Sequence, residues 1–184
     1  MNPLKERLRQ ILLSKSYEKR MVTLASGKTS DFYFDGKQTT LDPEGSALTG
    51  RLFFDAIESS GRRVEAIGGP TLGADPIVTA ISLTSQLKGR PIPAFIVRKE
   101  PKKHGTAAWI EGEKNLRPGM QVALVEDVIT SGASLLKAVE KVERAGYFVS
   151  LVLAIVDREE GGAEKIRGQG YRLVSLFSKG ELLL

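Results

Sequence analysis

The feature that most constrains this 184-residue chain is the stretch 122–134, where apolar residues give way to carboxylates, then to small residues, and then to a helix. The residues from Val122 to Val125 are short and apolar, which is typical of a buried parallel strand. Beyond the small residues, apolar side chains recur at helical spacing at Leu135, Ala138, Val139 and Val142. A strand, a tight turn and a helix in this order predict one unit of an α/β fold.

The turn of this unit has the composition of a phosphate-binding loop. Its backbone N–H groups, hydroxyls and the positive end of the following helix dipole would all point to one place. It consists of Thr130, Ser131, Gly132, Ala133 and Ser134. The preceding pair, Glu126 and Asp127, would repel phosphate, so we expect these carboxylates to bind a sugar diol or a hydrated divalent cation. The residues alone also allow an ordinary turn, capped by Ser131 or Ser134, with solvated carboxylates.

The remaining chain alternates strands with helices, which predicts one α/β domain over residues 1–184 with a mainly parallel sheet. Ligands of such sheets gather where the strands end, which here means the loops after Gly68, Val97, Val125 and Val156. We expect helices at 4–15, 42–60, 75–87, 135–146 and 161–168, and strands at 21–24, 31–35, 64–68, 94–97, 122–125, 149–156 and 173–177.

Composition narrows the classes of function. The chain has no cysteine and a single histidine, His104, which argues against thiolate chemistry and a histidine-based metal cage. Its start lacks a signal-peptide core and it has no apolar run of membrane-spanning length, so we expect a cytoplasmic protein without membrane contact. The net charge of +5 suits a polyanionic small substrate. Nucleic acid is disfavoured, because the basic residues form no block and are not interleaved with aromatic ones.

The stretch 122–134 resembles the phosphoribosyl-pyrophosphate (PRPP) binding motif of the type I phosphoribosyltransferases. In that family the acidic pair contacts the ribose hydroxyls and the loop holds the 5′-phosphate. The resemblance implies a mainly parallel sheet flanked by helices, with a small hood of a helix and a hairpin formed by about residues 1–41. It also implies a catalytic role for Asp127, and PRPP contacts from Glu126, Asp127, Val128, Ile129, Thr130, Ser131, Gly132, Ala133 and Ser134.

A basic segment at 98–105, Arg-Lys-Glu-Pro-Lys-Lys-His-Gly, resembles the catalytic loop of the orotate phosphoribosyltransferase family. That match implies pyrophosphate-binding places for Arg98, Lys99, Lys102 and His104, with Lys102 as the key catalytic lysine. The family's loop reaches into the active site of the neighbouring subunit, which implies a homodimer. Read without the resemblance, a solvated basic loop is the preferred interpretation of the segment, because charged loops usually face water.

Two further segments resemble the same family. The hairpin 26–36 is similar to the segment that lies against the orotate ring, which implies orotate contacts for Tyr33 and Phe34. Alternation places Phe32 on the face of Phe34, so we expect Phe32 to pack in the core. Thr130 matches a threonine that contacts orotate, and Arg158 matches the arginine that grips its carboxylate, as a planar guanidinium can. A salt bridge at the strand end is the plain alternative for Arg158.

The chain also departs from the family pattern. It has Ala25 and Gly73 where many members carry lysine, and Lys28 or the turn 71–75 are the candidates for replacing those cations. The resemblance as a whole implies transfer of a phosphoribosyl group from PRPP to orotate in pyrimidine synthesis, with Mg²⁺ held mainly by substrate oxygens rather than directly by protein side chains. Two alternatives stay open: a transferase for a purine base, and a PRPP-sensing regulator that binds RNA or DNA.

Overall fold

A parallel sheet forms the centre of the computed structural model, which describes residues 2–23, 29–101 and 108–184. Its strands are β3 (Ala66–Gly68), β6 (Gln121–Ile129), β7 (Phe148–Asp157) and β8 (Leu173–Ser178), hydrogen-bonded in the order β3-β6-β7-β8. All three pairings are parallel. Beyond β3, the short β4 (Ile96–Val97) continues the layer through parallel bridges at Ala94 and Val97. The predicted α/β fold with a mainly parallel sheet is confirmed.

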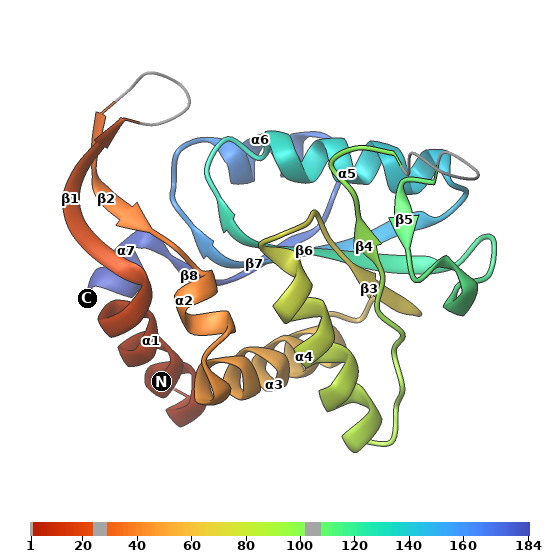
Figure 1. Cartoon of the computed structure of the whole chain (residues 1–184), viewed down its shortest axis with the longest axis horizontal. Helices are drawn as coiled ribbons and strands as arrows, with labels where there is room; N and C mark the ends of the chain where they lie inside the picture. The colour runs from red at the N-terminus through yellow and green to blue at the C-terminus, as the bar shows by residue number, and fades with distance from the viewer. Residues whose placement is uncertain (1, 24–28, 102–107) are drawn as a thin grey trace.

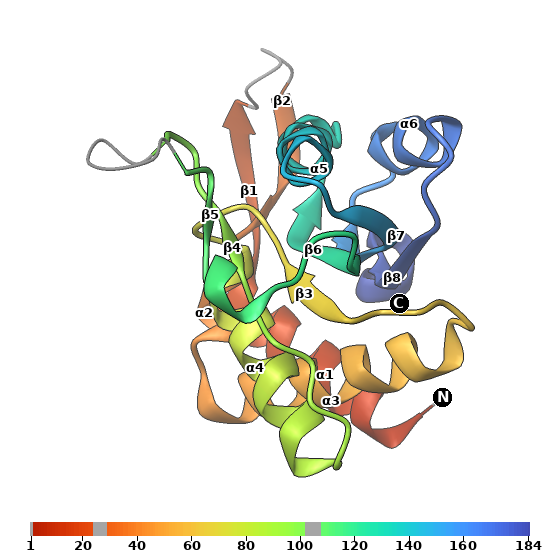
Figure 2. The same ribbon diagram turned by 90° about the vertical axis from the view of Figure 1, so that its right-hand side faces the viewer.

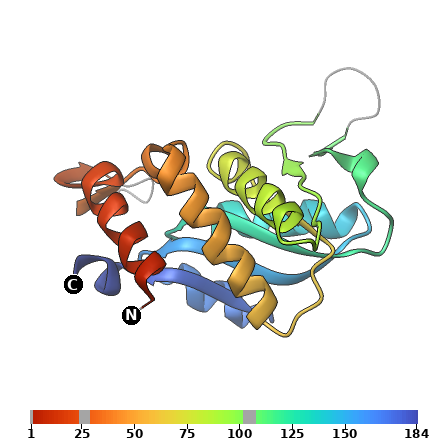
Figure 3. The same cartoon turned by 90° about the horizontal axis from the view of Figure 1, so that it is seen from below.

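Helices cover both faces of this sheet (Figures 1 and 2). One face carries α1 (Pro3–Ile11), α3 (Pro43–Ser59) and α4 (Ala74–Leu87), which lie side by side when the molecule is seen from below (Figure 3). The opposite face carries α5 (Ala133–Arg144) and α6 (Gly162–Gly168).

Because helices cover both faces of the sheet, the stretches 122–125 of β6 and 151–156 of β7 are apolar at every position. Alternate residues of a strand point to opposite faces. In β6, Ala123 and Val125 join the core that contains α3 and α4, whereas Val122 and Leu124 join the core that contains α5. A strand that is buried on both faces cannot alternate apolar with polar residues.

Local signals set the ends of α3 as predicted. Asp42 is its N-cap, and its carboxylate accepts hydrogen bonds from the backbone N–H groups of Glu44 and Gly45 at 3.1 and 2.9 Å. Pro43 occupies the first helical turn, where its missing N–H costs nothing. Gly61, with φ of 67°, turns the chain away after the helix.

A hairpin next to the sheet is formed by β1 (Tyr17–Thr23) and β2 (Thr29–Phe34), which pair antiparallel. Phe32 of β2 is almost fully buried and its ring stacks on that of Phe34 at 5.9 Å, so its predicted place in the core is confirmed. The N-terminal segment is tied to the C-terminal helix α7 (Lys179–Leu183) by a hydrogen bond from the Arg9 guanidinium to the Leu182 carbonyl.

Several predicted boundaries are wrong, and β6 matters most for the site. The strand runs to Ile129 instead of ending at Val125, because β7 pairs with it as far as Ile129 opposite Asp157. Similarly, β1 begins at Tyr17 instead of Met21, because Tyr17 pairs with Phe34. The expected helix 4–15 is α helical only to Ile11 and ends in a π-helical turn, and the expected strand 64–68 begins at Ala66.

Four short elements were not predicted. Each is at most five residues long, too short to show a helical or strand period in the sequence. They are α2 (Lys37–Thr40), β5 (Ile110–Glu111), the 3-10 turn Glu113–Asn115 and α7.

Candidate active site

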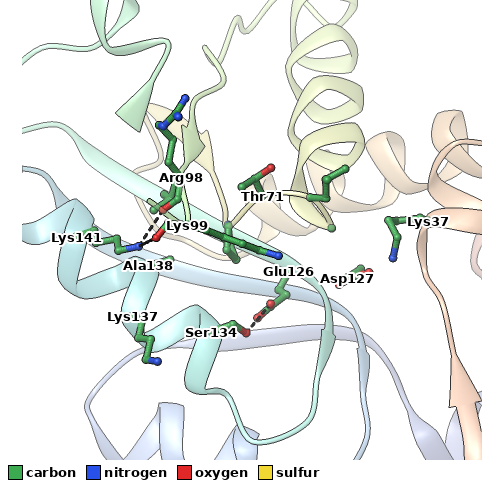
Figure 4. A pocket seen from close by; sticks show the side chains of 14 residues that line it. Lys37, Thr71, Arg98, Lys99, Glu126, Asp127, Ser134, Lys137, Ala138 and Lys141 are labelled. Carbon is green, nitrogen blue, oxygen red and sulfur yellow. Dashed lines mark hydrogen bonds between the residues drawn. The ribbon is translucent and has the colours of Figure 1, made fainter. Parts of the chain in front are cut away.

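A cavity of about 670 Å³ lies at the edge of the sheet where the parallel strands end (Figure 4). The acidic pair of β6 lies at its centre, and the turn after β3, the start of the segment after β4 and the first turns of α5 surround it. Its lining consists of Lys37, Pro70, Thr71, Leu72, Gly73, Val97, Arg98, Lys99, Glu126, Asp127, Ser134, Lys137, Ala138 and Lys141. The cavity therefore lies at the edge where the sequence predicted ligand binding, which is the edge at which parallel sheets generally bind ligands.

Glu126 is half-buried next to the helix that follows the strand. Its Oε1 accepts a hydrogen bond from the Ser134 hydroxyl at 2.7 Å, while its buried Oε2 has no hydrogen-bond partner among the described residues. Burial raises the pKa of Glu126 to about 7, against the opposing effect of the Ser134 hydrogen bond. An acceptor left without a partner in a cavity is suited to a hydroxyl donor or a hydrated cation supplied by a ligand.

Asp127 is enclosed more tightly. A Cβ placed on Gly36 would lie 2.8 Å from the Asp127 Cβ, and one placed on Gly73 would lie 2.7 Å from Asp127 Oδ1. Burial raises the pKa of Asp127, while the charge of Lys37 acts against that rise. Two segments that are distant in sequence therefore approach this carboxylate closely because each has a glycine there.

The predicted phosphate loop leads directly into α5. Gly132 adopts a φ of 70° at the N-cap position, a left-handed conformation that glycine takes without strain. A Cβ on Gly162 would lie 2.5 Å from the Thr130 carbonyl oxygen, so the start of α6 packs closely against the loop. The first N–H groups of a helix have no partner within it, which leaves those of α5 available for an anion.

Cations gather on another side of the acidic pair. Arg98 forms an ion pair with Glu111 at 2.7 Å, and its backbone N–H donates to the Trp109 carbonyl at 2.9 Å. The ammonium of Lys141 donates to the Arg98 carbonyl at 2.9 Å and lies 4.0 Å from the centre of the Trp109 ring. Lys99 extends across the cavity toward Glu126 (Figure 4). Lys102 and His104, predicted for the same place, lie outside the described residues, as do Ala25 and Lys28.

The residues predicted to bind orotate lie on neighbouring elements and not in the lining of this cavity. Arg158 is 8% exposed at the end of β7, where its guanidinium pairs with Glu160 at 2.9 Å and donates to the Phe32 carbonyl at 3.2 Å. The strand-end salt bridge that the sequence allowed for Arg158 therefore forms in this structure. The ring of Tyr33 is covered by the Arg20 guanidinium at 3.8 Å from the ring centre.

The sequence did not single out three lysines of the lining: Lys37, Lys137 and Lys141. Lys137 and Lys141 had a usable signal, because they lie four residues apart on the helix that follows the phosphate loop and so share one face. Lys37 had none, because it belongs to the unpredicted helix α2.

A parallel sheet whose central strand ends in two half-buried carboxylates, followed by a small-residue turn, a helix start and a rim of cations, defines a type I phosphoribosyltransferase. No protein-family model matches the chain. It is 50% identical over 179 residues to the orotate phosphoribosyltransferase of Sorangium cellulosum, covering 97% of this chain and 93% of the relative. With the orotate phosphoribosyltransferase of Aquifex aeolicus it shares 45% identity over 182 residues, which is 97% of each protein. The chain belongs to the orotate phosphoribosyltransferase family and is a transferase.

Solved structures agree with this assignment. Orotate phosphoribosyltransferase from Mycobacterium tuberculosis in complex with Fe(III) dicitrate has a TM-score of 0.85 and 40% identity, covering 99% of this chain and all of that one. The same Mycobacterium enzyme in complex with PRPP has a TM-score of 0.81 and 37% identity over the same shares. An adenine phosphoribosyltransferase from Thermoanaerobacter pseudethanolicus, with a TM-score of 0.67 and 17% identity, shares the fold alone.

Proposed function

We propose that the protein transfers the 5-phosphoribosyl group of PRPP to N1 of orotate, giving orotidine 5′-monophosphate and pyrophosphate in pyrimidine synthesis. The bond from ribose C1 to pyrophosphate oxygen breaks with its electron pair on that oxygen, the bond from C1 to N1 forms, and the proton of N1 passes to the departing pyrophosphate or to solvent. The observation that carries this proposal is a cavity that places two half-buried carboxylates between a helix N-terminus and a group of cations. A phosphorylated sugar with a diol and a pyrophosphate leaving group complements that order of charges.

The contacts to PRPP follow from this arrangement. The N–H groups and hydroxyls of the loop 130–134 bind the 5′-phosphate, and Glu126 and Asp127 accept hydrogen bonds from the ribose hydroxyls. The unpartnered Glu126 Oε2 gains a donor when the diol binds. Arg98 and Lys99 line the cavity of their own subunit, whereas Lys102 and His104, further along the segment, would come from the partner subunit in the proposed dimer. Together these cations stabilise the charge that develops on departing pyrophosphate.

Orotate is proposed to bind beside the hairpin, against Tyr33 and Phe34 and near Thr130. Arg158 is the residue for its carboxylate, because a guanidinium binds a planar carboxylate through two parallel hydrogen bonds. In this structure the Arg158 guanidinium forms an ion pair with the Glu160 carboxylate at 2.9 Å. On binding, the orotate carboxylate would replace that of Glu160. The exchange keeps the buried arginine charge paired, which avoids the cost of an isolated charge.

Magnesium is proposed as the cofactor, held mainly by substrate oxygens. The described residues contain no group of three or more carboxylates and histidines able to hold a metal alone. Mg²⁺ commonly keeps several waters and binds through one or two carboxylates plus phosphate oxygens, and the acidic pair with its free Oε2 suits that donor set. The bound ion would neutralise part of the pyrophosphate charge, while Glu126 and Asp127 orient the ribose.

A homodimer is proposed in which the segment 98–105 of one subunit reaches the active site of its partner. A largely apolar groove of about 570 Å³ beside the cavity supports this proposal. Three leucines at this groove, Leu41, Leu72 and Leu83, are each more than 60% exposed. An exposed apolar cluster of this kind is a common feature of subunit interfaces.

A cytoplasmic location is proposed on the chemistry of the reaction. PRPP and orotidine 5′-monophosphate are polyanions, and a lipid bilayer strongly opposes the passage of charge. In the part of the chain that the structure describes, none of the helices has the length and apolarity needed to cross a membrane.

The test of the proposed reaction is the loss of orotate ultraviolet absorbance when enzyme, Mg²⁺, PRPP and orotate are mixed. We expect a loss that requires all four components and releases one pyrophosphate for each orotate consumed. Adenine, guanine and hypoxanthine serve as rival acceptors. A gel shift with mixed RNA, with and without PRPP, tests the alternative that the protein is a PRPP-sensing regulator that binds nucleic acid. Turnover of a purine base without turnover of orotate would contradict the proposal.

A further inference from the structure

Lys37 occupies a corner of the cavity that the proposed contacts leave without a role. It lies on α2, directly after the hairpin, and lines the cavity together with Leu72, Gly73 and Asp127. Figure 4 shows it beside Asp127, across the cavity from Arg98 and Lys141. The cations at the site therefore lie on two opposite sides of the acidic pair.

The position of Lys37 is fixed by its neighbours. Its ammonium pairs with the carboxylate of Asp35 at 2.5 Å, and the same carboxylate accepts the Lys37 backbone N–H at 3.2 Å. The preceding Gly36 packs against Asp127, where a Cβ would lie only 2.8 Å from the Asp127 Cβ. The hydrogen bond with Asp35, and more weakly the charge of Asp127, raises the pKa of Lys37, so it carries its charge at neutral pH. Its side chain keeps 40% exposure, which leaves room for a ligand.

The acidic pair shows which end of PRPP faces Lys37. Glu126 accepts a hydrogen bond from the Ser134 hydroxyl, so it lies on the side of the phosphate loop. Asp127 lies on the other side, between Gly36 and Gly73. A ribose whose 5′-phosphate is bound at the loop and whose diol is bound by the pair directs its C1 substituent away from the loop. That direction leads to the corner of Lys37 and the turn 70–73.

We propose that Lys37 binds the pyrophosphate group of PRPP from the α2 side, opposite Arg98 and Lys99. It supplies the positive charge at the corner where Gly73 has no side chain. The ion pair with Asp35 fixes the position of its ammonium before the ligand binds. Pyrophosphate then lies between two groups of cations, which stabilises it more than one group alone. This role rests on the proposed transfer from PRPP, and it adds a binding residue that the sequence did not indicate.

The experiment compares Lys37→Gln and Lys37→Arg with the matched control Lys15→Ala. Glutamine keeps a donor for Asp35 but has no charge, and arginine keeps the charge. Lys15 is a comparably exposed lysine that pairs with Asp42, and it lies outside the cavity lining. The measurements are the KM values for PRPP and orotate, the dissociation constant of magnesium pyrophosphate by calorimetry, and the melting temperature.

We expect Lys37→Gln to weaken PRPP and pyrophosphate binding by about ten- to a hundredfold, the range of a charged hydrogen bond. The KM for orotate should stay unchanged, Lys37→Arg should restore most of the loss, and Lys15→Ala should behave as wild type. Pyrophosphate binding by the glutamine variant within about twofold of wild type would overturn the role, as would an effect on the orotate KM alone. If that variant does not fold, Lys37→Met takes its place under the same criteria. Loss of orotate turnover by wild type and Lys15→Ala alike would instead reject the proposed function.

Discussion

At the scale of single residues, the acidic pair shows how the fold changes a side chain's chemistry. Glu126 and Asp127 belong to a strand that is buried on both faces, and burial raises the pKa of each. An ionised carboxylate in such a place is costly unless it has partners. Hydrogen bonds from the substrate's hydroxyls, and any cation bound with it, would reduce this cost.

Replacing Glu126 by glutamine should stabilise the ligand-free protein at alkaline pH. The folded pKa of about 7 lies above the ordinary 4.5, so the stabilising contribution is complete below pH 4.5 and is lost as the pH rises through 7. The full effect corresponds to roughly 3 kcal/mol. We expect the melting temperature of Glu126→Gln to exceed that of wild type by several degrees at about pH 8.5, with little difference near pH 5. The exposed Glu164→Gln is the control, and an equal difference at both pH values would contradict the argument.

Any side chain at Gly73 is predicted to weaken PRPP binding and to destabilise the fold, because Gly73 lies close against Asp127. Alanine there would place a Cβ 2.7 Å from Asp127 Oδ1, so the carboxylate must move. We expect Gly73→Ala to lose about 1–3 kcal/mol of stability and to raise the KM for PRPP about tenfold or more. Gly168→Ala is the matched control, since a Cβ there meets no atom within 4 Å. Urea unfolding and steady-state kinetics measure both changes, and an unaltered KM in the folded Gly73→Ala variant would refute the claim.

At the scale of elements, α5 connects the two charged parts of the site. Its first turn follows Gly132 and presents the loop that is proposed to bind phosphate. Its last turn carries Lys141, which donates to the carbonyls of Arg98 and Lys99 at 2.9 and 3.3 Å. One helix therefore fixes both the proposed 5′-phosphate site and the start of the basic segment.

Lys141→Met tests this connection, because methionine keeps an apolar chain over Trp109 and removes the donors. We expect turnover to fall about tenfold, since a hydrogen bond from a charged donor contributes about 1.5–3 kcal/mol. Hydrogen exchange at the Arg98 amide should also become faster, as the segment loses its attachment. Arg144→Met is the control on the same helix, where the arginine pairs with Glu140. Unchanged exchange and turnover in Lys141→Met would show that the segment is held by other contacts.

At the scale of the whole molecule, the proposed dimer makes a prediction that a monomer cannot fulfil. If the segment 98–105 acts in the partner's site, Lys102→Ala and Asp127→Asn damage different sites of a mixed dimer. Each variant alone should lose turnover by orders of magnitude. An equal mixture, after subunit exchange, should recover about a quarter of wild-type activity, because half of the dimers are mixed and each has one intact site. The absence of recovery in mixed dimers, detected by differently tagged subunits, would place the segment in its own subunit's site.

The strand and turn of 122–134 were predictable because a buried strand and a small-residue turn are local patterns. The end of β6 was not, because pairing of Ile129 with Asp157 on β7 extends the strand beyond its apolar run. The position of Lys37 in the cavity was equally hidden, since α2 is a single turn placed by its packing against Asp127.

The sequence by itself determined the α/β architecture, the caps of α3 and the positions of the acidic pair and the small-residue turn. These features depend on residues that are neighbours in the chain or recur with a fixed period. Only the tertiary structure decided which residues share the cavity, how Gly36 and Gly73 enclose Asp127, and that Lys37 faces Arg98 across the site. Such contacts join segments far apart in the chain, and their geometry follows from how the sheet and its helices pack rather than from any local pattern.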